Sequence, residues 1–506
     1  MLVFHGYLLR GTGSNVYNAE LAQALARLGH EVHLLCQDRR ADALPWVDAV
    51  GDWDGGELAV RALRQPVRCT VYRPDIGRTL PVYVADEYEG FEARPFPSLD
   101  DAELERYLAA NVAAVAEVAD RVRPDVALAN HAVMGPVVLA RALRGRVPYA
   151  VKIHGSALEY TVRPRLERFG PYAREGLEAA RSVLVGSRHT AERLWDTFGD
   201  SALRSKTHLG PPGVDVRAFR PRSRAEAAER LRALADRLEA SEAASWGGER
   251  GAASALRALR PEAEPVVSYV GKLIVSKGID LLAAAWPLVI ARVPEARLCV
   301  VGFGTYRDAL VRLLVALGSG DLTTARGIAA RGRELEGGPA GELEYLAAFL
   351  DGLEGERRER YVRAAARAAG RVHLTGRLEY SDVPDLLSGC TAQVVPSTFP
   401  EAFGMVAAEA AACGALPLSA AHSGLAEVTA QLAEAVEEPL RPLLSFALGP
   451  RAVEQIADRL VRWLELDDAV RARASSALAA LARERFSWEG VAKRVVAAAG
   501  GELERR

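Results

Sequence analysis

The feature that most constrains the fold is an alternation of short apolar segments with longer segments of helical periodicity. In the first part of the chain, the apolar segments lie at residues 2–9, 32–37, 125–130, 148–155 and 183–187. The helical segments between them lie at residues 16–29, 102–124, 137–145 and 174–182. Short apolar strands that alternate with helices are typical of a parallel sheet covered by helices. The order predicts a doubly wound, Rossmann-like α/β domain over residues 1–215.

The same alternation begins again at residue 265 and predicts a second Rossmann-like domain over residues 265–485. Its apolar segments lie at 265–273, 296–304, 371–378, 392–397 and 416–420, and its helical segments at 278–292, 381–389 and 405–414. Two stretches rich in Ala, Arg and Glu interrupt the alternation. We expect a helical connector at 216–264, flexible at 244–254, and a helical insertion at about 306–370. Two such domains should face a central cleft, with ligands beyond the carboxyl ends of the strands.

Composition narrows the classes of function. Hydrophobic residues make up 49% of the 506 residues and charged residues 26%, which is typical of a globular chain. The net charge of −2 supplies no chain-wide basic field for nucleic acid. No apolar run is long enough for a membrane span, no signal peptide is predicted, and the five cysteines form no CxxC pair. These features predict a protein of the reducing cytoplasm that binds no nucleic acid.

Two loops that follow predicted strands are suited to bind phosphate. Gly11 to Ser14 joins the first strand to the first helix, where glycine lets the backbone approach a ligand and the helix N-terminus favours an anion. Val16 stands where the dinucleotide fingerprint would need glycine. Lys272 and Lys277 follow the strand that opens the second half, and the chain has only five lysines among 64 basic residues. Two ammonium groups at one strand end can neutralise a diphosphate leaving group.

A third cluster follows the strand at 392–397 and carries the strongest signal. Glu401 lies in the loop, where its carboxylate can accept hydrogen bonds from sugar hydroxyls. A helix is expected to start near Phe403, so its first N–H groups can face an anion. These groups belong to Phe403, Gly404 and Met405. Glu409, two turns into the helix, can accept both hydroxyls of a ribose.

The segment Pro396 to Gly414, with its Glu401-x7-Glu409 spacing, resembles the signature of the family-4 retaining glycosyltransferases of GT-B fold. Further segments match the family in the same order along the chain: the loop at 11–14, His154-Gly155, Val185-Gly186-Ser187, residues 211–215, Gly271 to Gly278, Val301 to Gly304, Gly376 and residues 422–428. The segment 486–499 resembles the family's C-terminal helix, which crosses back to the first domain. The resemblance covers most of the chain outside the two interruptions.

The resemblance implies transfer of a sugar, with retention of its anomeric configuration, from a nucleotide-diphosphate sugar to a hydroxyl acceptor. Uridine is the family's commonest donor base. Glu401 would bind hydroxyls of the donor sugar, Glu409 the donor ribose, and His154 the reacting sugar. Lysines would hold the diphosphate, and the loop around Gly13 would close on it. We therefore predict catalytic roles for His154, Lys277 and Glu401, and donor binding by Gly13, Lys272, Lys277, Phe403, Gly404, Met405 and Glu409.

No cofactor and no metal are predicted for this site. In a GT-B site, lysines and helix N–H groups take the place of the cation that other transferases use, and the leaving phosphate oxygen takes the acceptor's proton on the front face. The close aspartates Asp52 and Asp54 lie in a Gly-rich polar stretch that we expect to be a surface loop. Lys272 departs from the family, which commonly has arginine there; lysine can neutralise phosphate but cannot form the bidentate fork.

Three other functions stay open at this point. A hydrolysing nucleotide-sugar epimerase could use the same architecture without an acceptor. A nicotinamide-dependent oxidoreductase would need a Tyr-x-x-x-Lys pair, and neither Tyr149 with Lys152 nor Tyr269 with Lys272 has that spacing. A catalytically silent sugar-binding protein is the third. The sequence also leaves open the donor base and sugar, the acceptor (small molecule, lipid or glycan), the oligomeric state, and peripheral membrane contact through the basic stretch 163–168.

Overall fold

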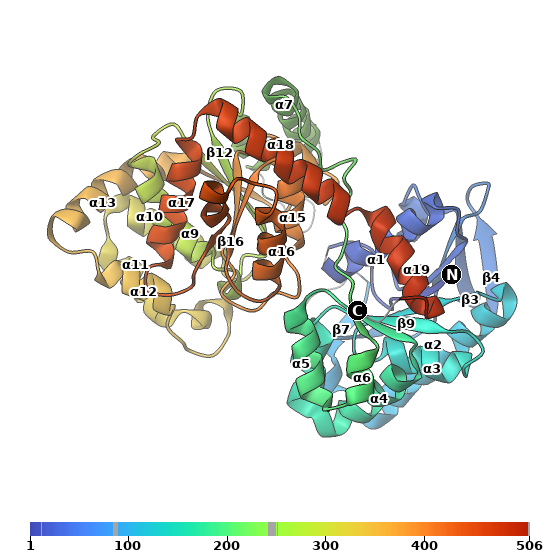
Figure 1. The fold of residues 1–506 in the computed structure, drawn as a ribbon. Coiled ribbons are helices and arrows are strands. Elements are labelled where there is room, and N and C mark those ends of the chain that lie inside the picture. The colour runs from blue at the N-terminus through green and yellow to red at the C-terminus, as the bar shows by residue number, and fades with distance from the viewer. Residues whose placement is uncertain (12, 84–89, 241–248, 250, 504–506) are drawn as a thin grey trace. The chain divides into compact units, whose positions relative to one another are not determined.

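The structure is a computed structural model that describes residues 1–11, 13–83, 90–240, 249 and 251–503. The chain divides into two compact units, whose elements are labelled in Figure 1. Unit 1 comprises Met1–Gly213 and Phe486–Arg506, and unit 2 comprises Val214–Arg485. Most of the connector segment that we expected to be flexible, and Thr12 of the glycine loop, lie outside the described residues.

Unit 1 is built on a nine-stranded sheet with the strand order β11-β10-β9-β8-β1-β2-β5-β3-β4, and a separate pair, β6-β7. Its strands are β1 (Leu2–Phe4), β2 (Val32–Leu35), β3 (Ala49–Asp54), β4 (Glu57–Ala62), β5 (Cys69–Arg73), β6 (Thr79–Val82), β7 (Glu92–Pro95), β8 (Ala127–Asn130), β9 (Tyr149–Ile153), β10 (Ser182–Val185) and β11 (Thr207–Leu209). Its α-helices are α1 (Gly13–Arg27), α2 (Asp101–Val122), α3 (Gly135–Leu143), α4 (Leu166–Ala179), α5 (Arg188–Phe198), α6 (Ser201–Ser205) and α19 (Trp488–Gly500). All neighbours in the large sheet are parallel except β3 and β4.

The order of the sheet in unit 1 reverses between β1 and β8. Starting from β1, the sheet grows through β2 and β5 on one side and through β8, β9 and β10 on the other, which is the Rossmann order. Open sheets of this kind bind ligands where the order reverses, beyond the carboxyl ends of the two central strands. In unit 1, that place is marked by the residues that follow Phe4 and Asn130.

The prediction that Asp52 and Asp54 lie in a surface loop is wrong. Both residues belong to β3, which pairs with β4 in a hairpin, and Asp52 accepts a hydrogen bond of 2.6 Å from Arg73 Nε on β5. Gly55 and Gly56 form the turn, with φ angles of 59° and 90° that suit glycine. A two-residue Gly-Gly turn is a hairpin signal, which the polar composition of this stretch obscured.

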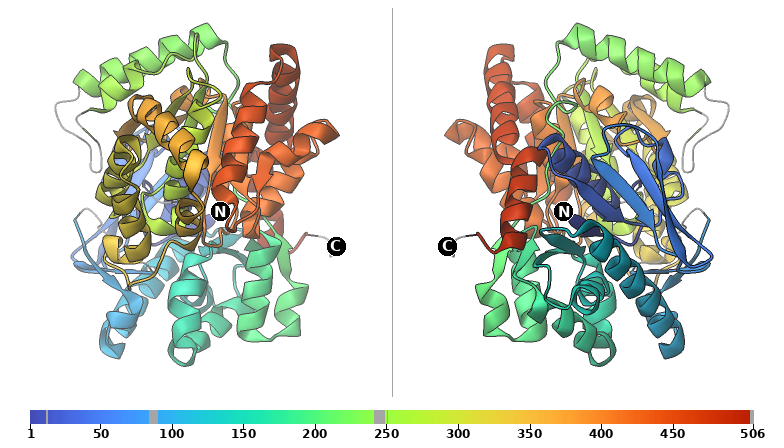
Figure 2. Two further views of the ribbon diagram at one scale, coloured as in Figure 1. Left: turned by 90° about the vertical axis from the view of Figure 1, so that its left-hand side faces the viewer. Right: turned by 90° about the vertical axis from the view of Figure 1, so that its right-hand side faces the viewer.

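Helix α19 belongs to unit 1 although it lies at the far end of the sequence. It packs against α1 and strand β9, as both Figures 1 and 2 show. Trp488, the first residue of α19, is fully buried with its ring centroid 5.3 Å from that of Tyr17 on α1. A Cβ added to Gly213 would lie 2.6 Å from the Trp488 ring, so the last residue of the first segment of unit 1 must stay small. Helices α2, α3 and α4 pack together and form a separate group in the same unit.

Unit 2 contains a six-stranded parallel sheet with the order β14-β13-β12-β15-β16-β17. The strands are β12 (Val266–Val270), β13 (Arg297–Val301), β14 (Val372–Gly376), β15 (Ala392–Val395), β16 (Leu416–Ala420) and β17 (Ser445–Phe446). The α-helices are α7 (Arg224–Ala240), α8 (Ala252–Arg257), α9 (Ile279–Ile290), α10 (Arg307–Ser319), α11 (Leu322–Arg331), α12 (Glu344–Asp351), α13 (Gly355–Ala368), α14 (Val383–Leu387), α15 (Met405–Ala412), α16 (Ser423–Ala433), α17 (Ala452–Leu464) and α18 (Asp468–Arg485). Counted along the chain, this is again the Rossmann order, and it reverses between β12 and β15.

Two groups of helices flank the sheet of unit 2 in Figure 1: α9 with α13 and α17, and α15 with α16 and α18. Helix α7 packs against α8 and α14, while α8 also contacts β14. Helices α10–α13 lie between β13 and β14 in the sequence. The order reversal of the sheet therefore stays uninterrupted, and the loops after β12 and β15 are neighbours.

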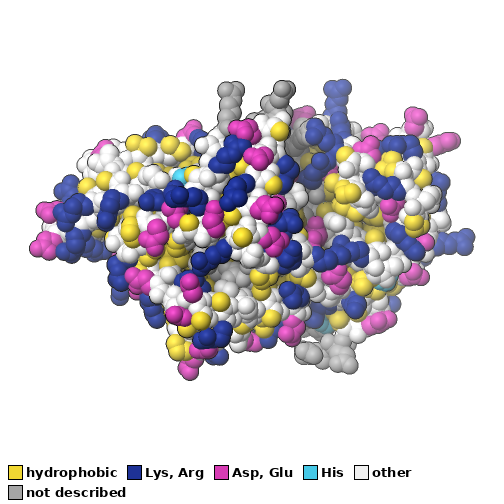
Figure 3. Space-filling view, turned by 90° about the horizontal axis from the view of Figure 1, so that it is seen from above, with side chains coloured by type: hydrophobic (Ala, Val, Ile, Leu, Met, Phe, Trp, Pro, Cys, Tyr) yellow, Lys and Arg dark blue, Asp and Glu magenta, His cyan; other side chains and the backbone are white. Residues whose placement is uncertain are grey.

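The surface carries mixed charge. On the face shown in Figure 3, basic and acidic side chains are interspersed, in keeping with the net charge of −2. Among the described residues, no helix combines the length and apolar character that a membrane crossing requires.

Candidate functional site

The two loops at the order reversal of unit 2 are joined through Ser276. Strands β12 and β15 pair in register at Val267 and Ala392. Beyond their carboxyl ends, the N–H of Thr398 donates a hydrogen bond of 3.0 Å to the carbonyl oxygen of Ser276. Gly278 has a φ of +65°, and a Cβ there would lie 2.0 Å from the carbonyl oxygen of Pro396. Only glycine permits this approach. It brings the loop after β12, which carries Lys272 and Lys277 (the lysine loop), onto the loop after β15, which carries Glu401 (the Glu401 loop).

Lys277 and Glu401 form an ion pair at this junction. The Lys277 ammonium donates to Glu401 Oε1, and the Ser397 hydroxyl donates to the same oxygen over 2.6 Å. Burial alone would raise the pKa of Glu401, but the Lys277 charge and the two hydrogen bonds outweigh it and hold the pKa below its ordinary value. The Lys277 and Glu401 side chains are 32% and 23% exposed, so both can still reach a ligand.

The start of α16 fixes the backbone around Glu401. The N–H of Glu401 donates to the Ser423 hydroxyl over 2.8 Å, and the N–H of Gly424 donates to the Glu401 carbonyl over 2.9 Å. His422 Nε2 donates over 2.7 Å to the carbonyl oxygen of Ser397. Ser423 adopts a left-handed φ of 48°, which is uncommon for a residue with a side chain. These contacts fix the backbone that carries the Glu401 carboxylate and thereby help to orient it.

The helix after Glu401 is α15, which begins at Met405 rather than near Phe403. Gly404 precedes it with a φ of 124°, so the chain turns sharply there and Phe403 stays outside the helix, buried. The first N–H groups of a helix have no acceptor within it and favour an anion. Glu409 lies on α15 and is 4% exposed, and it accepts a hydrogen bond of 3.0 Å from the Tyr380 hydroxyl.

Lys272 lies on the same loop as Lys277, directly after β12. Its carbonyl oxygen accepts a hydrogen bond of 2.8 Å from the Tyr269 hydroxyl, which fixes the backbone where the strand ends. The loop also packs tightly against the one that follows β13, because a Cβ at Gly302 would lie 1.8 Å from the Gly271 carbonyl oxygen. The predicted donor residues of the second half are thus brought to one edge of one sheet: Lys272, Lys277, Glu401, Phe403, Gly404, Met405 and Glu409.

The order reversal of unit 1 holds a network of neutral side chains. Asn130, the last residue of β8, donates to the Phe4 carbonyl over 3.0 Å and to Asn18 Oδ1 over 2.9 Å. Its own side-chain oxygen accepts from His154 Nε2 over 2.8 Å. His5 Nδ1 accepts from Asn18 Nδ2 over 3.1 Å, so helix α1 is tied to the ends of β1, β8 and β9. Gly13, predicted to close on the donor, is the first residue of that helix.

His131 is the exception in this network. It follows Asn130 with a left-handed φ of 70° and is 2% exposed. Its ring centroid lies 4.5 Å from that of Tyr83 and 4.9 Å from that of His154. Neither ring nitrogen has a hydrogen-bond partner among the described residues. Buried polar groups without partners are rare and are often completed by a ligand or water.

Burial keeps these histidines neutral. It lowers the pKa of His131 and His154 well below the ordinary value, and that of His5 to about 4. Beside them, Lys152 donates to the Gly210 carbonyl oxygen and lies 5.4 Å from the Tyr17 ring centroid. Burial lowers the pKa of Lys152 to about 7.

Of the residues in this network, His154 was predicted from the sequence and its neighbours were not. His5, Asn18, Asn130 and His131 converge on the same edge of the sheet. Asn130 and His131 could have been found, because they follow a predicted strand directly, as His154 does. His5 also follows a strand directly, but the apolar segment expected at 2–9 ran past it. Asn18 gave no such signal, since only the folded α1 brings it to Asn130.

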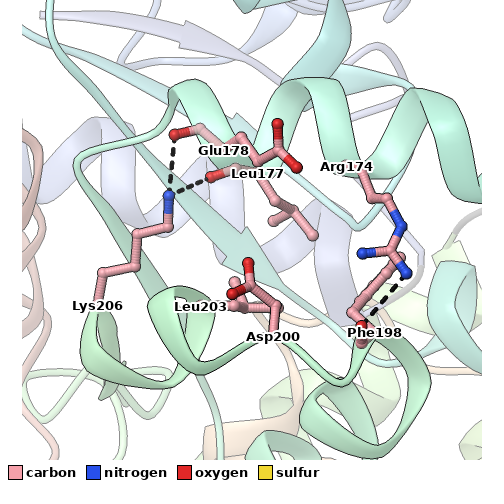
Figure 4. Close-up of a pocket in the computed structure, with 7 residues that line it drawn as sticks. All are labelled: Arg174, Leu177, Glu178, Phe198, Asp200, Leu203 and Lys206. Atoms are coloured by element: carbon pink, nitrogen blue, oxygen red, sulfur yellow. Dashed lines mark hydrogen bonds between the residues drawn. The ribbon is translucent and has the colours of Figure 1, made fainter.

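A hollow beside the end of α4 in unit 1 contains charged residues that already have structural roles. As Figure 4 shows, the Lys206 ammonium points at the carbonyl oxygens that end α4, with distances of 2.7 Å to Leu177 and 2.9 Å to Glu178. Arg174 donates to the Phe198 carbonyl over 3.2 Å. Cations that satisfy helix carbonyls stabilise those helix ends. We therefore assign no substrate to this hollow. Among the residues that the structure describes, no three His, Cys, Asp or Glu side chains are grouped as metal ligands.

Known proteins match both parts of the chain. Residues 12–205 match the model of the glycosyl transferase 4-like domain, and residues 343–477 match that of the glycosyl transferases group 1. The chain is 27% identical over 495 residues to the D-inositol 3-phosphate glycosyltransferase of Xylanimonas cellulosilytica, which covers 95% of this chain and 89% of that protein. It is also 32% identical to the GDP-mannose-dependent alpha-(1-6)-phosphatidylinositol monomannoside mannosyltransferase of Mycolicibacterium smegmatis. That match extends over 210 residues, which are 40% of this chain and 44% of that protein.

Among solved structures, sucrose-phosphate synthase from Thermosynechococcus elongatus matches with a TM-score of 0.58 and 20% identity, over 97% of this chain and 96% of that one. The two Rossmann-like units and these matches define a nucleotide-sugar-dependent glycosyltransferase of GT-B fold. The chain belongs to the group 1 glycosyltransferases, the family-4 retaining enzymes. The predicted fold class and family are therefore confirmed, and the roles of the individual site residues stay predictions.

Proposed function

We propose that this transferase binds the diphosphate of its donor at the order reversal of unit 2. The observation that carries the proposal is the Lys277–Glu401 pair beside the start of α15. Lys272 and Lys277 supply positive charge to the diphosphate together with the first N–H groups of the helix. Glu401 accepts hydrogen bonds from the sugar hydroxyls, and the buried Glu409 accepts those of the ribose.

Unit 1 contributes neutral groups to the reaction. His154 contacts hydroxyls of the transferred sugar, and the loop at Gly13 closes on the donor. We add His131 to these residues. Its two ring nitrogens are buried and have no hydrogen-bond partner among the residues that the structure describes, so they can pair with ligand hydroxyls. A neutral imidazole can donate and accept at once, which suits hydroxyl groups.

The reaction retains configuration and takes place on one face of the sugar. The bond between the anomeric carbon and the phosphate oxygen breaks, and the acceptor oxygen bonds to the same face of that carbon. The acceptor's proton moves to the leaving phosphate oxygen, so a nucleoside diphosphate is released. The lysines and the helix N-terminus stabilise the charge that develops on that phosphate, so no metal is required.

For the donor we propose a uridine diphosphate sugar, with a guanosine diphosphate sugar as the alternative that the mannosyltransferase relative suggests. For the acceptor, the relative that spans nearly the whole chain supports a hydroxyl of an inositol phosphate, either free or in a lipid headgroup. A thermal-shift series with UDP, GDP and their sugars identifies the base, because a ligand of the folded state raises its stability. Transfer assays with free and lipid-linked inositol phosphates then separate the two acceptors.

Three variants test the site. We expect Glu401→Ala, His154→Ala and Lys277→Ala each to abolish transfer while the circular dichroism spectrum stays that of the parent. Product anomers are followed by NMR, which must show retention, and chelation of divalent metals must leave the rate unchanged. Parent-like turnover in any two of the variants would refute the proposed site. Consumption of the nucleotide sugar at full rate without an acceptor would instead indicate a hydrolysing enzyme.

A further inference from the structure

The insertion between β13 and β14 contains a tightly closed loop at residues 332–341, between α11 and α12. Gly332 and Gly341 form an isolated β-bridge at its base, and Gly338 N–H donates to the Arg333 carbonyl over 2.9 Å. A Cβ at Gly332 would lie 1.7 Å from the Gly341 carbonyl oxygen, so the closure requires glycine. Within the loop, Arg333–Glu336 form a 3₁₀ turn. These contacts close the loop at residues 332–341.

This loop places the Glu336 carboxylate on the lysine loop of the donor site. Glu336 Oε2 accepts the backbone N–H of Val275 over 2.7 Å, and its other oxygen accepts from Arg333 Nε over 3.2 Å. The Glu336 side chain is only 9% exposed. The contact joins residues 61 positions apart in the sequence.

Val275 is the first residue of a 3₁₀ turn, Val275–Lys277. The preceding residue, Ile274, has an apolar side chain and makes no capping hydrogen bond. The first N–H groups of such a turn need an acceptor, which the carboxylate of Glu336 provides. The other side of the turn is held by the Ser276 carbonyl, which accepts the N–H of Thr398. The turn that ends in Lys277 is therefore fixed by the insertion on one side and by the Glu401 loop on the other.

We infer that Glu336 is a positioning residue: its carboxylate caps the turn that aims Lys277 at the donor diphosphate. The insertion thereby becomes a part of the donor site. Arg333 pairs with Glu336 and offsets its negative charge, which would otherwise repel the diphosphate nearby. The inference rests on the proposed role of Lys277 as a diphosphate ligand.

The test compares Glu336→Ala, which removes the cap, with Glu336→Gln, which keeps an oxygen acceptor. Glu334→Ala is the matched control, because Glu334 lies in the same loop, is 49% exposed and, among the residues that the structure describes, pairs through its side chain only with Arg331. The readout is the affinity for the nucleoside diphosphate relative to that for the same nucleoside without phosphates, measured by calorimetry. We expect Glu336→Ala to lower the diphosphate affinity about tenfold without changing the nucleoside affinity. Glu336→Gln should stay within about threefold of the parent, and Glu334→Ala should be unchanged.

A double-mutant cycle with Lys277→Ala makes the inference separable from the proposed function. Lys277→Ala alone should weaken diphosphate binding, and Glu336→Ala should then have little further effect, since both act through the same ammonium. Unchanged binding in Lys277→Ala would reject the proposed function. Weakened binding in Lys277→Ala with parent-like or fully additive binding in Glu336→Ala would reject the inference alone. An equal loss of nucleoside and diphosphate affinity in Glu336→Ala would also reject it, because the residue would then be merely structural.

Discussion

The order reversals of the two sheets share a backbone plan and differ in chemistry. In unit 1, the strands on either side of the reversal lead into His5 and His131, which burial keeps neutral. In unit 2, they lead into Lys277 and Glu401, which are charged and paired. The strand order alone therefore decides where a ligand can bind, and the residues that follow the strands decide which chemistry is recognised. Neutral imidazoles suit hydroxyls, and a lysine beside a helix N-terminus suits a diphosphate.

The largest effect should come from removing charge in unit 2. We expect Glu401→Gln to lower kcat/KM about 1,000-fold, or about 4 kcal/mol. The amide keeps the shape of the side chain, but it leaves Lys277 without its anion and is a weaker acceptor of hydrogen bonds from hydroxyl groups. Steady-state kinetics with the donor measure it. Glu434→Gln, an exposed carboxylate that pairs with Arg485, is the control and should have parent kinetics. A fall of less than tenfold for Glu401→Gln would mean that the pair is structural.

A smaller effect should follow from changing the neutral network of unit 1. We expect His131→Phe to lower kcat about 100-fold, or about 2.7 kcal/mol, because the ring is kept while both nitrogens are lost. The thermal midpoint should change by only a few degrees, since no hydrogen bond to a described residue is removed. The partly exposed His30, changed to Phe, serves as the control. A large loss of stability with unchanged kcat would show that His131 acts in folding and not on the substrate.

The two units should also respond differently to acid. The pKa of His131 and His154 lies well below the value of about 6.5 in an unfolded chain, so below pH 6.5 the unfolded state binds more protons. Stability from these groups is complete above pH 6.5 and is lost as the pH falls, by up to about 1.4 kcal/mol per pH unit for each group. In unit 2, burial raises the pKa of Asp280 to about 7, and its effect has the opposite sign: stability is present at low pH and is lost as the pH rises toward 7.

Acidification from pH 7 to pH 5 should therefore loosen unit 1 more than unit 2. Amide hydrogen exchange of the full chain, corrected for the intrinsic pH dependence of exchange, measures both units in one experiment. His131→Phe should reduce the acid sensitivity of unit 1, because it removes one of the titrating groups. Earlier loss of protection in unit 2 would contradict the assignment of neutral histidines to unit 1.

The smallest effect concerns the backbone that supports Glu401. Ser423 has a left-handed φ of 48°, where glycine is favoured, but its hydroxyl accepts the Glu401 N–H. In Ser423→Gly, relief of the backbone strain offsets the lost hydrogen bond, so we expect an unchanged thermal midpoint and a kcat/KM about threefold lower. Ser423→Ala loses the bond and keeps the strain, so it should be about 1 kcal/mol less stable than Ser423→Gly by denaturant unfolding. Equal stability of the two variants would remove strain from the explanation.

Several features of the site were predictable because they are local. The alternation of strands and helices predicted the positions of the loops at the site, and the segment around Glu401 predicted a strand, a loop and a helix in that order. Details of geometry were not: α15 begins two residues later than expected, because Gly404 takes a positive φ that sequence pattern does not reveal. The hairpin at Asp52 was missed for a similar reason, since polar strand residues look like a loop until a partner strand is known.

By itself, the sequence determined the class of fold, the family and the residue types at the strand ends, because these follow from periodicity and short motifs. Only the tertiary structure decided that Lys277 meets Glu401, 124 positions away, and that Glu336 of the insertion caps the lysine turn. It also decided that the histidines of unit 1 are neutral and that His131 has no described hydrogen-bond partner. The physical reason is that strand order and burial are properties of the whole packed unit. Charge state and long-range pairing depend on that packing and not on the neighbours in sequence.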